Sequence, residues 1–84
     1  MLVKHVHIDD RIRVAAIFEN GRLKPVWFDL AGKRYDVKKL CLTWDYKTGR
    51  AAILNFAVWD GVNSYVLEFN TSNHIWSLSM STIE

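Results

Sequence analysis

The 84-residue chain has one cysteine, one proline and only four glycines. A single cysteine, Cys41, excludes an internal disulfide and a thiolate metal cluster. The glycines stand one at a time, so none belongs to a glycine-rich phosphate-binding loop. No apolar run approaches the roughly 20 residues of a membrane span, and the first residues lack the apolar segment of a signal peptide. We therefore expect a cytoplasmic protein with no membrane partner.

Lys and Arg are absent after Arg50. Residues 21–50 contain eight Lys or Arg against three Asp, a net charge of +5, whereas residues 51–84 contain three acids and no Lys or Arg. Such asymmetry indicates a partner with negative charge that contacts the middle of the chain.

Half of the residues are apolar, as a packed core requires, and the length predicts a single domain over residues 1–84. Most segments alternate apolar and polar residues with the period of two that is typical of half-buried strands. Residues 64–70 and 74–81 are the clearest examples. We expect them to pair as an antiparallel hairpin that turns six side chains to one core: Tyr65, Leu67, Phe69, Trp76, Leu78 and Met80.

Turn signals separate these segments at Asn20-Gly21, Ala31-Gly32, residues 47–49, Asp60-Gly61 and residues 70–73. Asn, Asp and Gly tolerate the positive φ angles that hairpin turns need. The spacing is too short for parallel crossovers. It predicts an all-β fold, an antiparallel meander of five to seven strands that forms a small half-open barrel or roll.

Two segments depart from simple alternation. Residues 51–59 are apolar on both faces, which favours a central strand, with a short buried helix as the alternative. Between Val37 and Leu40 the apolar residues change from odd to even numbers, which predicts a β-bulge or sharp bend at Lys38-Lys39. Cys41 lies in the apolar run that follows, so we expect its thiol to be buried and unreactive.

The pattern P-V-W-F-x-x-x-G-K-R-Y-x-V over residues 25–37 resembles a hairpin found in a group of small bacterial all-β domains. The likeness extends over about residues 24–46 and the last two strands. Leu30 replaces a common tryptophan of the group, and Lys33 replaces an arginine. Some of these domains are associated with translesion DNA polymerases, which implies an accessory role in nucleic-acid metabolism.

The same hairpin combines aromatic and basic residues. Small sheets bind nucleic acid by stacking bases on aromatic side chains and neutralising phosphates with Lys or Arg. If alternation places Val26 and Phe28 in the core with Tyr35 and Val37, then Trp27 joins Arg34 and Lys38 on the outer face; whether Trp27 is exposed stays open at this point. Tyr46 is a second candidate for stacking. We expect binding of single- or double-stranded nucleic acid through Trp27, Lys33, Arg34, Lys38, Lys39, Lys47 and Arg50.

Other roles fit the same residues. Lys and Arg also protect exposed edge strands from aggregation, while aromatics fill small cores. The alternative to nucleic-acid binding is a protein-interaction or subunit-scaffolding domain, which would dock a partner through a hydrophobic edge or the apolar face around residues 51–59. A barrel that holds a small ligand is a third reading.

Catalysis and metal binding have little support in the sequence. His5 and His7 share one strand face with Asp9, and His74 lies elsewhere, but no complete ligand set follows. No serine lies in a nucleophile elbow motif. We therefore expect a binding module that is not an enzyme and that holds no metal and no cofactor.

Overall fold

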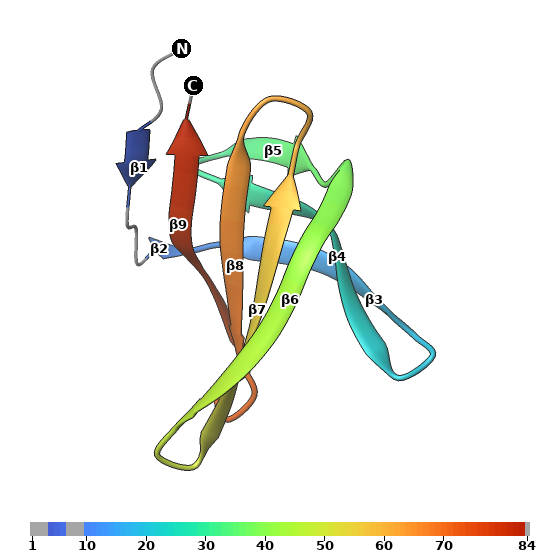
Figure 1. Ribbon diagram of the computed structural model, residues 1–84, viewed down its shortest axis with the longest axis vertical. Helices are drawn as coiled ribbons and strands as arrows, with labels where there is room; N and C mark the ends of the chain where they lie inside the picture. The colour runs from blue at the N-terminus through green and yellow to red at the C-terminus, as the bar shows by residue number, and fades with distance from the viewer. Residues whose placement is uncertain (1–3, 7–9, 84) are drawn as a thin grey trace.

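The computed structural model describes residues 4–6 and 10–83, with side chains described over residues 12–79 (Figure 1). This part of the chain is all-β. Its strand segments are β1 (Lys4–Val6), β2 (Asp10–Arg11), β3 (Arg13–Glu19), β4 (Arg22–Leu30), β5 (Lys33–Asp36), β6 (Lys39–Thr48), β7 (Ala51–Trp59), β8 (Ser64–Asn70) and β9 (Ile75–Ile83). No helix that could cross a membrane occurs among the described residues.

The strands form two antiparallel sheets that pack as a half-open roll. One sheet has six strands in the order β1-β9-β8-β7-β6, with β2 also paired to β9, and the other has three in the order β3-β4-β5. From β3 to β5, and again from β6 to β9, each strand pairs with the next in the chain. Figure 1 shows β3–β5 behind the larger sheet and running across it. The expected meander is therefore confirmed.

The chain passes from the small sheet to the large one at Val37–Lys38. The Val37 N–H donates to the Val26 carbonyl oxygen at 3.0 Å, and the next N–H, of Lys38, donates to Trp59 at 2.8 Å. The bend expected near Lys38 is thus present. A separate register shift lies between Leu40 and Leu42 in the pairing with β7.

The core lies between the sheets and consists of Phe28, Phe56, Val58, Tyr65, Leu67 and Leu78. The ring of Phe28 stacks on Tyr35 with centroids 5.1 Å apart, and it meets the edge of Tyr65 at the same centroid distance. Aromatic pairs of this kind contribute more than the area they bury. Through them the small sheet is joined to the large one.

The predicted hairpin of β8 and β9 is confirmed. Leu67 stands opposite Leu78, and Phe69 stands opposite Trp76. Tyr65, Leu67 and Leu78 are buried, while Phe69 and Trp76 are half-buried against the core. A register shift after Val66 pairs that residue with Met80, whose side chain lies outside the described ones.

Residues 51–59 form the strand β7 between β6 and β8, so the helical alternative is wrong. Phe56 and Val58 enter the core. Ile53 and Asn55 are also buried, on the opposite face, where they pair with Tyr46 and Trp44 of β6. Both faces of β7 are covered, which explains why its sequence is apolar throughout.

One expectation about the β4–β5 hairpin is wrong. Phe28, Tyr35 and Val37 pack in or against the core as expected, but Val26 is 38% exposed. The pairing of β3 with β4 shifts between Ala15 and Ala16, which stand opposite Trp27 and Pro25, so no residue of β3 stands opposite Val26. The bulge turns Pro25 inward in place of Val26.

Candidate functional site

Trp27 lies half-buried on the outer face of the three-stranded sheet, as the alternation predicted. The Arg34 guanidinium carbon is 4.7 Å from the centroid of its indole ring, and that of Arg13 is 5.8 Å away. Arg34 follows from the hairpin pattern. Arg13 comes from β3, and its approach to Trp27 depends on the pairing of β3 with β4.

Both arginines are ion-paired. The Arg13 Nε donates to Asp29 Oδ2 at 2.9 Å, and the Arg34 Nε donates to Asp36 Oδ1 at the same distance. The two carboxylates balance the charge of the two guanidinium groups around Trp27. This face is therefore aromatic and polar but locally neutral, which weakens its long-range attraction for phosphate.

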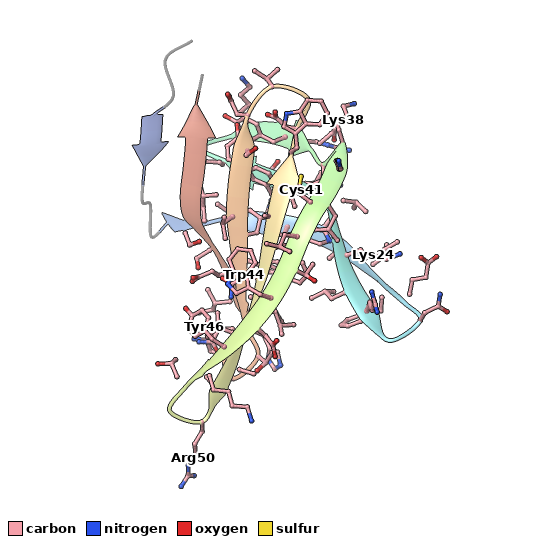
Figure 2. All side chains as sticks on the ribbon, in the orientation of Figure 1. Lys24, Lys38, Cys41, Trp44, Tyr46 and Arg50 are labelled. Atoms are coloured by element: carbon pink, nitrogen blue, oxygen red, sulfur yellow. The ribbon has the colours of Figure 1, made fainter. Side chains whose placement is uncertain are left out.

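The other expected cations are spread over the molecule. Lys33 reaches from the opposite face of β5, with its Nζ 5.2 Å from the Tyr35 ring centroid. Lys38 and Lys39 lie at the start of β6, while Lys47 and Arg50 lie at the far end of the β6–β7 hairpin, about 25–30 Å away at the usual rise per residue. Figure 2 shows Lys38 and Arg50 at the two ends of this hairpin. The expected site residues do not converge on one surface.

The strand β6 has a different character. It is the last strand of the six-stranded sheet, and every residue from Cys41 to Thr48 is exposed. Three large side chains on its outer face are Leu42 at 62% exposure, Trp44 at 41% and Tyr46 at 46%. Figure 2 labels Trp44 and Tyr46 along this strand. An exposed edge of this length with apolar side chains is what natural sheets usually avoid.

The β-bulge at Cys41 explains this exposure. Before the bulge, Leu40 stands opposite Val58 and packs against the core. After it, Leu42 stands opposite Ala57, on the outer face. The expectation that Cys41 is buried is wrong, since its side chain is exposed. The strand β6 has a neighbouring strand, β7, on one side only.

Tyr46 is held on this outer face by its hydroxyl, which donates to Glu68 Oε1 at 3.3 Å. Loss of solvation, followed by the charge of Glu68, raises the pKa of the Tyr46 phenol. The ring lies on the same face of β6 as Trp44, two residues away.

A groove of about 560 Å³ runs along the inner side of β6, opposite the β3–β4 hairpin. Leu23, Leu40, Leu54 and Phe56 are among its apolar lining residues, and Arg22, Lys24 and Asp45 are its charged ones. The Lys24 Nζ donates to Glu19 Oε1 at 2.8 Å, and this bond lowers the pKa of Glu19. Figure 1 shows the β3–β4 hairpin diverging from β6 on this side of the molecule.

A second, more open hollow of about 540 Å³ lies near Trp27, between β3 and the turn that precedes β9. Arg13, His74 and Trp76 also line it. Among the described residues no group of three His, Cys, Asp or Glu side chains could hold a metal ion. His7 and Asp9, considered above as metal ligands, lie outside the described residues.

Comparison with known proteins gives no relative for this chain. No family model, no curated protein and no solved structure matches it.

Proposed function

We propose that this protein is a protein-interaction module that binds an extended segment of a partner along the free edge of β6. One observation carries the proposal: a ten-residue edge strand that is exposed from Cys41 onward and bears Leu42, Trp44 and Tyr46 on its outer face. In strand addition, main-chain hydrogen bonds supply affinity, and pockets beside the edge select alternate side chains of the incoming strand.

The edge has backbone groups free to make these bonds. Gly49 and Arg50 form a two-residue turn between Thr48 and Ala51, and Gly49 has a φ of +59°. A turn of this length joins its flanking residues by a hydrogen bond, and bonded pairs then alternate along an antiparallel ladder. Tyr46, Trp44 and Leu42 therefore bond to β7, whereas the N–H and C=O groups of Thr43, Asp45 and Lys47 point to the free edge.

Side-chain selection would come from both faces of the edge. An added strand would place alternate side chains on the outer strip of Leu42, Trp44 and Tyr46, and the others at the groove lined by Leu23 and Phe56. Arg22 at the groove has no ion pair among the described residues. It favours a partner segment that carries an acidic residue on this side.

The test is a selection of displayed random ten-residue peptides on the immobilised protein, followed by affinity measurement with two variants. Asp45→Pro removes an outward N–H, and proline is tolerated at such edge positions. Asp45→Ala removes the same carboxylate and keeps the N–H. We expect the selected peptides to lose at least tenfold in affinity for Asp45→Pro only.

Hydrogen exchange gives a second measurement that needs no substitution. Bound peptide should protect the amides of Thr43, Asp45 and Lys47, which face away from β7. Equal affinity for both variants, or protection confined to other strands, would contradict the proposal.

Nucleic-acid binding at Trp27 is a second candidate, favoured by the Arg34 guanidinium stacked at 4.7 Å on an outward-facing indole. Such a pair can extend a stack onto a base. The likeness of residues 25–37 to domains associated with translesion polymerases also favours it. A salt series with a single-stranded oligonucleotide tests it, since each phosphate contact adds about 0.7 to the slope of log affinity against log salt. Trp27→Ala should weaken this binding, and a slope near zero would reject it.

A further inference from the structure

We infer that the partner at the β6 edge is a second copy of this chain, paired antiparallel to β6 about a two-fold axis at Trp44. This inference rests on the proposed function, because it names the occupant of the same edge. It follows from the register that the described residues of β6 allow when the strand is laid against itself.

Hydrogen bonding across the edge requires the outward-facing residues to stand opposite one another. Four two-fold axes achieve this with a ladder of at least five residues between Cys41 and Thr48. They lie at Thr43, Trp44, Asp45 and Tyr46. Pairing about Thr43 confines the ladder to residues 41–45, because the bulge ends it at Cys41. Pairing about Asp45 places two copies of this carboxylate face to face, and like charges in opposite positions destabilise a strand pair.

Pairing about Tyr46 sets Asp45 opposite Lys47. However, Leu42 would then stand opposite Arg50 in the β6–β7 turn of the second copy, so Leu42 and Cys41 have no strand residue to pair with. Only residues 44–48 then overlap. Pairing about Trp44 extends the ladder from Cys41 to Lys47. It is therefore the longest register that opposes no like charges.

The register about Trp44 also matches the apolar residues. Leu42 stands opposite Tyr46 of the second copy, and Trp44 stands opposite its own equivalent. Their backbones bond to β7, so these are non-hydrogen-bonded pairs across the edge, in which side chains approach most closely. Leu42, Trp44 and Tyr46 of the two copies then form one continuous apolar surface across the interface, and their sides that face the strand edge are shielded from water. On the groove face, Thr43 stands opposite Asp45 of the second copy and can donate its hydroxyl hydrogen to the carboxylate.

The bulge limits the ladder. Beyond Cys41 the register shift turns Leu40 to the core, so its face no longer matches that of the second copy. The ladder from Cys41 to Lys47 contributes seven residues per copy against roughly 20–30 in a standard interface, so we expect a weak dimer that forms at micromolar concentrations or above.

Sedimentation velocity of the whole chain over a concentration series tests the association. Trp44→Glu places two carboxylates opposite each other at the axis, while Trp59→Glu adds the same charge on the same face of β7, outside the ladder. We expect the wild-type chain and Trp59→Glu to dimerise, with the dimer lost or at least tenfold weaker in Trp44→Glu.

Disulfide formation tests the register. In the Trp44 register Cys41 lies opposite Lys47 of the second copy, and the Cα separation of about 4.5–5.5 Å between opposite residues of antiparallel strands suits a disulfide. Lys47→Cys should therefore form a covalent dimer rapidly under mild oxidation. The wild-type chain and the double variant Cys41→Ser/Lys47→Cys should not, because equivalent cysteines would stand about 20 Å apart at the usual rise per residue.

A chain that stays monomeric at millimolar concentration, or one that cross-links equally in all three forms, overturns the inference. The peptide selection separates this result from failure of the proposed function. A monomer that binds selected peptides, and loses them in Asp45→Pro, keeps the edge as the binding site and refutes only the second copy.

Discussion

Leu67→Ala should be among the most damaging single substitutions in this fold. Leu67 lies on the central strand β8 and is fully buried, with Leu78 and Phe56 as its cross-strand neighbours. Phe28, from the other sheet, belongs to the same core cluster. The substitution therefore empties a site that is walled by both sheets.

The magnitude follows from the atoms removed. Three buried carbons at about 0.8 kcal/mol each give roughly 2.4 kcal/mol in transfer free energy. The cavity adds to this, because neighbours that already pair on both sides relax only in part, so we expect a loss of about 3–4 kcal/mol. At roughly 0.05–0.15 kcal/mol per residue, the whole fold has a free energy of unfolding on the order of 4–13 kcal/mol.

Equilibrium unfolding in urea measures the loss, with the m-value checked for constancy. Leu42→Ala is the matched control, since it removes the same atoms from a side chain that is 62% exposed on the edge strand. Its measured loss, taken at a concentration where the chain is monomeric, should stay below about 1 kcal/mol. Equal losses for the two variants, or a loss below about 1 kcal/mol at Leu67, would refute the placement of this leucine in the core.

Three further predictions address the turns, the thiol and the buried phenol. Ala31→Gly should raise the free energy of unfolding by about 0.5–1 kcal/mol in urea titrations, because Ala31 has a φ of +52° that glycine adopts without strain; a loss of stability would contradict this. Cys41 should react with a thiol reagent in the native state at a rate close to that of the urea-unfolded chain, since it is exposed on β6. A reaction that is a hundredfold or more slower in the native state, in a dilute and monomeric sample, would be inconsistent with that exposure. Burial, with a smaller contribution from the Asp60 carboxylate, raises the pKa of Tyr65 above its ordinary value of 10.0. The folded chain thus holds this proton more tightly than the unfolded chain, so stability is complete below about pH 10 and falls as the pH rises further. Tyr65→Phe should reduce that fall in thermal unfolding curves recorded from pH 8 to pH 11, and an unchanged pH dependence would show that Tyr65 does not contribute to it.

Local alternation was sufficient to predict much of the fold. The side chains of Leu67 and Leu78 recur at the period of two that a half-buried strand requires, and their hairpin is present as expected. Turn chemistry is local as well, so Asn20-Gly21 and Ala31-Gly32 could be recognised as hairpin turns. Both pairs have the positive φ angles that this turn requires.

The candidate sites were less accessible to the sequence. Alternation placed Trp27 on the outer face with Arg34, but neither the ion pairs of Asp29 and Asp36 nor the approach of Arg13 could be read from it. These contacts join residues on neighbouring strands, so they depend on the register between strands. The sequence held one signal of the β6 edge, the change of phase near Leu40, but not which face would be covered.

Sequence by itself determined the all-β class, the turn positions and the core residues of β8, because these follow from interactions within a few residues of each other. Tertiary structure decided the bulges at Val26 and Cys41, and it left β6 at the end of its sheet. A bulge reverses the face of every residue after it, and an edge exists only because no distant strand pairs with it. Both are properties of pairings between segments of the chain and not of a single segment, and they place Leu42, Trp44 and Tyr46 on the exposed outer face of the edge strand.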